Sequence, residues 1–251
     1  MSILAIDTST QVSSVAVMNE KRLQAEITMQ ARLTHSETLM PHIEAALRMA
    51  AVKKTELEGI AVSIGPGSFT GLRIGLAAAK AMAYALSLPI VGISTLAALA
   101  VHFPAPGARI LSLIDAQKGN AYAQAFHMEN GQPVPLGRVE VLAIEEVLAR
   151  ASRAGEPVIL TGDVVPKKIV GKLVVPEHVI LPPPQMQMPR AANVGLLGLQ
   201  RLARGASDNP MALEPVYIRR SEAEVLWERR HPDAPKGEEP ETKTIVMRKS
   251  S

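Results

Sequence analysis

The sequence contains no cysteine, which excludes disulfide bonds and thiolate metal sites and fits a reducing cytoplasm. Aromatic residues make up only 3% of the 251 residues, whereas hydrophobic residues make up 47%. The core must therefore be built mainly from aliphatic side chains and methionine. The formal net charge of +3 is too small to indicate direct nucleic-acid binding without a local basic patch.

Long uninterrupted hydrophobic runs are also missing. An acidic residue, Asp7, comes after only six residues, which is too early for the apolar part of a signal peptide. Arg73 and Lys80 interrupt the apolar run over residues 72–86, so this run does not have the character of a membrane span. We therefore expect a cytoplasmic protein with no membrane association.

Hydrophobic periodicity predicts an α/β fold in which antiparallel strands lead into parallel strands with helical crossovers. In the first part we expect strands 3–7, 12–18, 23–30, 59–64 and 89–93 and helices 38–50, 72–86 and 95–102. In the second part we expect strands 109–115, 121–127, 136–142 and 157–162, helices 144–154 and 191–203, irregular structure over 163–189, and an extended segment at 213–219.

The second part repeats the opening pattern of an apolar strand that ends in an aspartate, Asp7 in the first case and Asp115 in the second. This weak repeat predicts two lobes, residues 1–103 and 104–220, followed by a charged, disordered tail over 221–251. Each aspartate either faces a cleft between the lobes, where it could hold a metal–nucleotide complex, or caps its own hairpin.

The segment Gly65-Pro-Gly-Ser-Phe-Thr-Gly-Leu-Arg-Ile-Gly75 lies between a predicted strand and a predicted helix. Such a turn presents backbone N–H groups to an anion, or lets another backbone approach closely. The segment is not a Walker P-loop, which ends in Gly-Lys-Ser/Thr where this chain reads Gly71-Leu72-Arg73, and its glycine spacing differs from the dinucleotide-binding fingerprint. A tight structural turn is the competing interpretation. Ser68 is better placed to cap the helix than to act as a nucleophile.

Together with the aspartates, this turn gives a set of candidate cleft or nucleotide-binding residues. They are Asp7, Thr8, Ser9, Gly65, Gly67, Ser68 and Asp115.

The six histidines do not form a recognisable metal motif. His35 and His42 are seven residues apart, whereas zinc ligands on a helix lie four apart, and no third ligand accompanies them. We expect no metal bound by this chain. The short basic groups Arg219-Arg220 and Arg229-Arg230 lack interleaved aromatics, so a solvated surface is the default interpretation.

Several motifs together resemble the bacterial TsaB (YeaZ) family. They are Ile6-Asp7-Thr8-Ser9, Thr34-His35-Ser36-Glu37 with Pro41, the glycine segment 65–75, Ile114-Asp115-Ala116 with Tyr122, and Glu214-Pro-Val-Tyr-Ile-Arg219. The resemblance runs from Met1 to about Arg220 and does not cover the tail. After Asp115-Ala116 the chain reads Gln117-Lys-Gly-Asn-Ala-Tyr122 and lacks the family's usual glutamate, which weakens a nucleotide- or metal-binding role for this loop.

The resemblance implies the two-lobed actin/sugar-kinase/Hsp70-like (ASKHA) fold and a role in making N6-threonylcarbamoyladenosine (t6A) at position 37 of tRNA. It implies a non-catalytic scaffold that pairs with the catalytic paralogue TsaD and acts with the ATPase TsaE. It also implies a homodimer in isolation and contact with tRNA through the complex. The stretch 94–102 lacks the H-x-x-x-H metal motif of the paralogue. No cofactor is expected on the chain alone, with ATP or ADP at the complex interface.

Small residues at 71, 75, 78, 79 and 83 form a stripe at helical spacing, and a second helix carries apolar residues at the same spacing. As a bare pattern, such a stripe favours packing in the chain's own core. With the resemblance, it favours a partner interface. That predicted interface consists of His35, Leu39, Met40, Ile43, Leu47, Gly71, Leu72, Gly75, Leu76, Ala79 and Ala83. The rival hypothesis is a stand-alone ASKHA-type ATPase or phosphotransferase that uses the two aspartates, and a zinc protease is a third.

Overall fold

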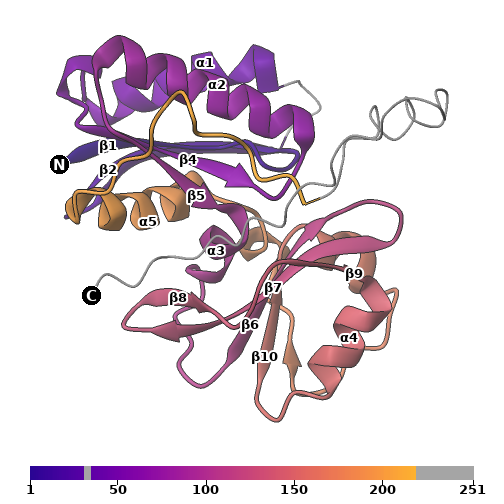
Figure 1. Ribbon diagram of the computed structural model, residues 1–251. Coiled ribbons are helices and arrows are strands. Elements are labelled where there is room, and N and C mark those ends of the chain that lie inside the picture. The colour runs from indigo at the N-terminus through magenta and orange to yellow at the C-terminus, as the bar shows by residue number, and fades with distance from the viewer. Residues whose placement is uncertain (31–34, 219–251) are drawn as a thin grey trace, which may run out of the picture.

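The computed structural model describes residues 1–30 and 35–218, and builds them into two lobes (Figure 1). The first lobe contains a five-stranded sheet in the order β3-β2-β1-β4-β5. Its strands are β1 (Ser2–Asp7), β2 (Val12–Asn19), β3 (Leu23–Gln30), β4 (Gly59–Gly65) and β5 (Ile90–Ser94). Strands β1, β2 and β3 pair antiparallel, whereas β1, β4 and β5 pair parallel, as the sequence predicts.

The second lobe repeats this topology. Its sheet has the order β11-β10-β6-β7-β8, with β9 paired to β7. Its strands are β6 (Arg109–Asp115), β7 (Asn120–Glu129), β8 (Gln132–Pro135), β9 (Glu140–Ala143), β10 (Val158–Thr161) and β11 (Val179–Ile180). Because β8-β7-β6-β10-β11 reproduces the order and directions of the first sheet, the predicted duplicated α/β architecture is confirmed.

Helices cover both faces of the first sheet. The helices of the chain are α1 (His35–Ala50), α2 (Phe69–Leu86), α3 (Thr95–Ala100), α4 (Ile144–Ser152) and α5 (Ala191–Ala203), with a 3-10 turn at Lys54–Glu56, a π-helical turn at Val165–Ile169 and a 3-10 turn at Pro184–Met186. Leu4, Ile6 and Val15 point to α1 and α2, whereas Ile3, Ala5 and Ala16 point to α5. The two-residue alternation of buried strands places these side chains on opposite faces.

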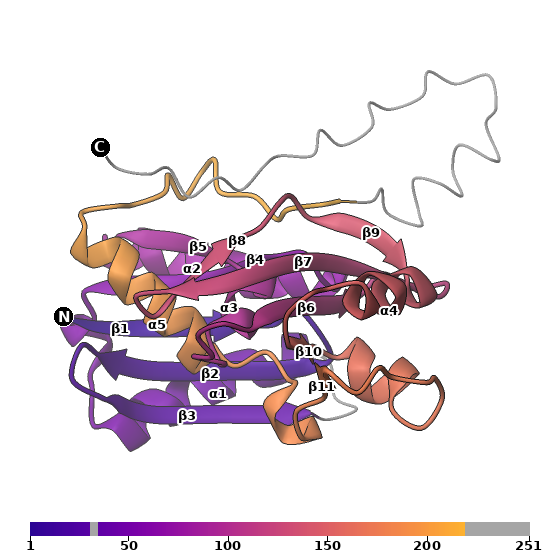
Figure 2. The ribbon, with the colours of Figure 1, turned by 90° about the horizontal axis from the view of Figure 1, so that it is seen from below.

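Helix α5 corrects the predicted division of the chain. The sequence places it in a second lobe over residues 104–220, but it packs against β1, β2, β4 and β5 of the first sheet (Figure 1). Gly195 and Gly198 allow this approach, since a Cβ at Gly198 would lie 2.4 Å from the Cβ of Ala61. The segment after α5 also stays with the first lobe, where Val216 N donates to Ile64 O at 2.7 Å (Figure 2).

One further prediction, of a strand, is wrong, and others fall on residues that the structure does not describe. The predicted strand 136–142 is wrong over most of its length, because residues 136–139 connect β8 to β9 and only 140–142 belong to a strand, β9. The two short strands pair with different halves of the ten-residue β7. The predicted tail 221–251, Arg219-Arg220 and Thr34 lie outside the described residues. In the part of the chain that the structure describes, no helix combines the length and apolar character needed to cross a membrane.

Candidate functional site

The glycine turn between β4 and α2 wraps around the turn between β1 and β2. The backbone N–H of Ser68 donates to Ser9 O at 2.7 Å, and Thr8 Oγ1 donates to Gly71 O at 2.7 Å. A Cβ at Gly67 would lie 2.2 Å from Ser9 O, and a Cβ at Gly75 would lie 2.2 Å from Thr8 Oγ1. The close approach that these glycines permit is therefore to the chain's own backbone, which favours the structural interpretation of the turn.

The candidate cleft residues of the first lobe lie mostly inside it. Asp7, Thr8, Ser9 and Gly65 are buried, and only Ser68 is exposed. The Ser68 side chain accepts a hydrogen bond from Gly71 N at 3.2 Å, which confirms its predicted role as the cap of α2.

Asp7 and Asp115 make the same local hydrogen bond in the two lobes. Oδ1 of Asp7 accepts from Ser9 N at 2.9 Å, and Oδ1 of Asp115 accepts from Gln117 N at 2.8 Å. Both bonds join residue i to residue i+2, as in an Asx turn. Of the two predicted uses of these aspartates, the structure shows the hairpin-capping one.

Two lysines of the π-helical turn neutralise the carboxylates of the second lobe. Lys168 Nζ lies 2.6 Å from Asp115 Oδ1, and Lys167 Nζ lies 2.8 Å from Asp163 Oδ2. Asp163 Oδ1 also accepts from Asp115 N at 3.0 Å, so the two strand ends are linked. Sequence reasoning missed Asp163 and both lysines, although the spacing of Asp163 and Lys167 is the i, i+4 spacing of a helical ion pair.

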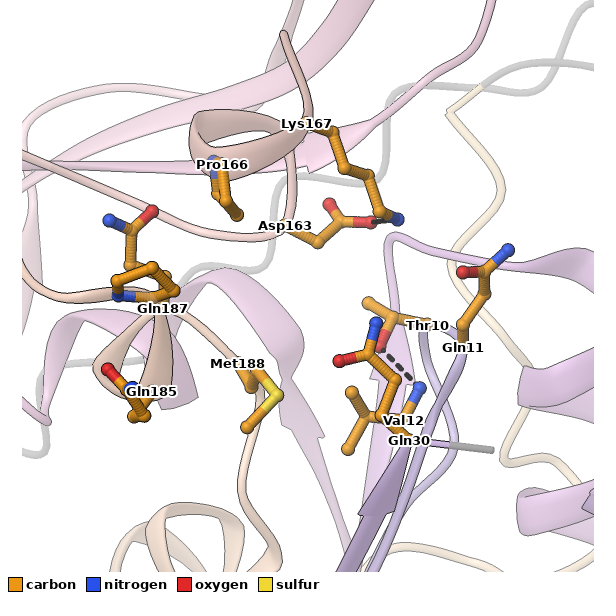
Figure 3. Close-up of a pocket in the computed structure, with 11 residues that line it drawn as sticks. Thr10, Gln11, Val12, Gln30, Asp163, Pro166, Lys167, Gln185, Gln187 and Met188 are labelled. Atoms are coloured by element: carbon orange, nitrogen blue, oxygen red, sulfur yellow. Dashed lines mark hydrogen bonds and ion pairs between the residues drawn. The ribbon is translucent and has the colours of Figure 1, made fainter. Parts of the chain in front are cut away.

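A pocket of about 350 Å³ opens between the lobes, next to these ion pairs (Figure 3). Its lining residues are Thr10, Gln11, Val12 and Gln30 from the first lobe, and Asp163, Pro166, Lys167, Pro184, Gln185, Gln187 and Met188 from residues 163–188. None of the predicted cleft residues lines it. No local sequence pattern marks this pocket, because its walls come from four separate segments.

The histidines do not gather into a metal site in the described part of the chain. Among residues 1–30 and 35–218, no three His, Asp or Glu side chains stand close enough together to hold a metal ion. Burial lowers the pKa of His102, and the positive charge of Arg190 lowers it further. Burial also lowers the pKa of His42.

The predicted partner interface needs correction at the level of side chains. On α1 and α2, the structure buries Leu39, Ile43, Leu47, Gly71, Leu72, Gly75, Leu76, Ala79 and Ala83. They pack on the first sheet of the same chain, so they do not lie on its surface. Met40 is exposed, and the side chain of His35 lies outside what the structure describes. The small-residue stripe thus serves the core, the use that the bare pattern favours.

The opposite face of α2 is exposed, and its charged residues are Arg73 and the half-buried Lys80. Its exposed residues are Thr70, Arg73, Ala77, Ala81, Tyr84 and Ala85. Tyr84 is 80% exposed, and Met40 on the neighbouring α1 is 52% exposed. A helix face turned to water normally carries more charged residues than this one, whose other exposed residues are mostly alanine.

The last described segment holds the start of α2 in place. Arg73 Nε donates to Tyr217 Oη at 2.9 Å, and the Arg73 guanidinium lies 3.8 Å from the centre of the Phe69 ring. The rings of Phe69 and Tyr217 are 4.7 Å apart. Arginine–aromatic contacts of this kind stabilise partly exposed sites modestly. Together with the hydrogen bond from Arg73, they hold the segment against the first turns of α2.

Comparison with known proteins gives consistent results. A family model described as TsaD, tRNA N6-adenosine threonylcarbamoyltransferase, matches residues 25–227. The chain is 31% identical over 231 residues to the tRNA threonylcarbamoyladenosine biosynthesis protein TsaB of Bacillus subtilis, covering 90% of this chain and 98% of that protein. It is 32% identical over 233 residues to the protein of the same name from Escherichia coli, covering 91% and 98%.

Solved structures agree with these relatives. A Pseudomonas aeruginosa protein described as similar to peptidase YEAZ superposes with a TM-score of 0.73 at 27% identity, covering 87% of this chain and 99% of that one. The structure described as YeaZ from the same organism gives a TM-score of 0.70 at 27% identity, covering 86% and 99%.

Proposed function

Because this chain belongs to the TsaB (YeaZ) family, we propose that it takes part in forming t6A in tRNA, as a non-catalytic scaffold that binds and activates TsaD. The relatives' names support the pathway, and the geometry supports the scaffold role. TsaE and tRNA would then meet this chain in the assembled complex, and ATP or ADP would bind at the junction of the subunits.

The exposed face of α2 carries the proposal. An 18-residue helix that shows alanine and tyrosine to solvent leaves apolar area uncovered. The charged residues on that side are Arg73 and the half-buried Lys80, and both are engaged by the segment after α5, Arg73 by Tyr217 Oη and Lys80 by Leu213 O. Small side chains let a second helix approach closely, and a tyrosine supplies a large anchor at the edge of such a contact. Exposed Met40 on the adjacent α1 extends the apolar area. A helical face of a sister subunit fits this surface.

The strand-end acids support a scaffold rather than an independent enzyme. Asp115 and Asp163 are each held by a lysine, and Asp7 is buried against Ser9. A carboxylate that orients a metal–nucleotide complex would have to give up these bonds first. The proposal therefore assigns the chemistry to the partner.

Charged substitutions on the exposed face of α2 test the proposal. We expect Ala81→Arg and Tyr84→Glu to abolish co-purification with TsaD and t6A formation in the reconstituted system, with the unfolding temperature unchanged. The matched control is Val174→Glu, since Val174 is 92% exposed on the second lobe. Substitutions at Gly75 or Ala79 would not serve, because they would damage the core.

Undiminished capture of TsaD by both α2 variants would refute the proposed docking face. The homodimer expected of the isolated chain offers a second measurement by sedimentation, since the same face would be buried in it. The ATPase hypothesis is tested separately, by calorimetry of the purified chain with Mg-ATP. Tight binding with hydrolysis, abolished by Asp7→Asn, would overturn the scaffold role.

A further inference from the structure

Arg73 differs from the other well-ordered arginines of the chain in what holds it. Arg109, Arg150 and Arg201 each form an ion pair with a carboxylate of the same chain. Arg73 is held by the aromatic side chains of Phe69 and Tyr217, and within residues 1–30 and 35–218 no carboxylate pairs with it. Its side chain thus has a defined position while its charge has no acidic partner among those residues.

The aromatic contacts leave most of the donors of this guanidinium unused. Nε donates to Tyr217 Oη at 2.9 Å, and the guanidinium carbon lies over the Phe69 ring, 3.8 Å from its centre. An arginine has five N–H donors, so the four on the two terminal amino groups remain, and no acceptor bonds them in the described part of the chain. Arg73 is also exposed to solvent. The two terminal amino groups can bind one carboxylate end-on through two parallel hydrogen bonds.

The position of the guanidinium is set before any partner binds. A flexible arginine loses rotamer freedom when a partner immobilises it, and this loss weakens binding. Here Phe69 in the first turn of α2 and Tyr217 in the segment after α5 already hold the group. That segment is itself anchored on the first sheet, because Val216 N donates to Ile64 O at 2.7 Å. A carboxylate that binds Arg73 therefore meets a preorganised group.

Helix α2 itself does not account for a cation at this position. Arg73 lies near the N-terminal end of α2, where the helix dipole favours acidic side chains over basic ones. The first turn of α2 contains no acidic residue that could offset the positive charge. An incoming carboxylate would be favoured by the arginine and by the helix end together.

The surroundings favour an acidic protein surface over a nucleic-acid backbone. The exposed residues in line with Arg73 along α2 are Ala77, Ala81 and Tyr84. Lys80, the other cation on that side of the helix, donates to Leu213 O at 3.1 Å. Phosphate backbones are bound by groups of cations, whereas an arginine beside apolar and aromatic residues is typical of protein interfaces.

We propose that Arg73 is a preformed receptor for a carboxylate, an aspartate or glutamate side chain of the partner that docks on the exposed side of α2. The inference rests on the proposed docking of TsaD and adds the chemistry of one contact. The apolar residues of α2 supply the contact area, and the two parallel hydrogen bonds of Arg73 fix the register of the partner along the helix.

The affinity of the full chain for purified TsaD, measured by isothermal titration calorimetry, tests this contact. We expect Arg73→Met to weaken binding about tenfold or more, because hydrogen bonds to a charged group are lost. Arg73→Lys should recover only part of the affinity, since an ammonium cannot form the two parallel bonds. Tyr217→Phe keeps the ring but loses the bond to Nε, and should weaken binding by less than Arg73→Met. The matched control Arg153→Met changes an exposed arginine of the second lobe and should bind as the parent chain does.

Salt dependence separates an ion pair with the partner from a purely structural role of Arg73. Added salt should weaken binding of the parent chain more than binding of Arg73→Met, because screening acts on the ion pair. The same salt dependence in both proteins would contradict the carboxylate contact.

The α2 variants distinguish failure of this contact from failure of the docking face. If Arg73→Met binds TsaD normally while Ala81→Arg and Tyr84→Glu do not bind, the receptor is wrong and the face stands. If Arg73→Met alone weakens binding, the face is wrong and the receptor stands. If Arg73→Met weakens binding of the chain to tRNA but not to TsaD, the anion is a phosphate and the proposal is wrong.

Discussion

The ammonium of Lys168 lies 2.6 Å from the carboxylate of Asp115, and this bond ties the π-helical turn to the end of β6. We expect Lys168→Met to lower the free energy of unfolding by about 1 kcal/mol, at the upper end for a partly exposed ion pair. Denaturant unfolding measures the change. Lys21→Met, at the exposed turn after β2, is the matched control and should change stability by less.

A double-mutant cycle with Asp115→Asn checks that the pair is responsible. The two substitutions should cost less together than the sum of their separate costs, and the difference should shrink at 1 M salt because screening weakens the pair. Fully additive costs would show that the contact contributes nothing.

The contact between Gly75 and Thr8 predicts a steric effect that one substitution causes and another relieves. A Cβ at Gly75 would lie 2.2 Å from Thr8 Oγ1, so Gly75→Ala must push α2 away from the β1–β2 turn. We expect a cost of about 1–3 kcal/mol, as for other overpacked cores. Adding Thr8→Ala removes the obstructing oxygen and should restore part of the lost stability, although it also removes the hydrogen bond to Gly71 O.

Gly155→Ala is the control for this prediction. Gly155 has a normal backbone conformation, and nothing lies within 4 Å of a Cβ built there. This substitution should leave the unfolding midpoint unchanged. If Gly75→Ala were equally harmless, the close packing of the glycine turn on the β1–β2 turn would be contradicted.

Local sequence patterns predicted where the helices and strands lie better than they predicted which elements pack against each other. Helix α5 begins and ends at the predicted residues, yet its assignment to the second lobe was wrong. Periodicity shows that one face of a helix is apolar, but not which sheet covers it. Gly195 and Gly198 fit α5 onto the first sheet, and this complementarity joins residues more than a hundred positions apart.

The candidate site shows the same limit of sequence patterns, which identify an apolar helix face but not the surface that it packs against. The small stripe on α2 was visible in the sequence, but a stripe that fits a partner also fits the chain's own sheet, and Ala79 and Ala83 turn out to be core residues. Asp7 and Asp115 were recognised as equivalent. The lysine that engages Asp115 was not, since it lies 53 positions further along the chain.

Asp208 closes the outer edge of β5, which predicts a role in solubility as well as stability. Its carboxylate accepts from Gly92 N at 2.7 Å and from Arg201 Nη2 at 2.9 Å. Asp208→Ala leaves the Gly92 N–H and the Arg201 guanidinium without this acceptor. We expect it to lower the free energy of unfolding by about 1–3 kcal/mol.

An unpaired edge strand is also a template for association with other chains. Light scattering during storage should therefore rise for Asp208→Ala, but not for the control Glu177→Ala, which removes an exposed carboxylate from the second lobe. Loss of stability without added scattering would show that the Asp208 side chain anchors α5 but does not protect the strand edge.

The lowered pKa of His102 predicts a loss of stability in mild acid. Burial and the charge of Arg190 make the folded protein resist protonation of this imidazole, so acid charges the unfolded chain first. Stability from this residue is therefore complete above about pH 6.5, the ordinary value of histidine, and falls as the pH drops below it. His102→Gln should flatten the dependence of the unfolding free energy on pH below about 6.5. Because burial also lowers the pKa of His42, adding His42→Gln should flatten it further, and an unchanged slope in both variants would contradict this account.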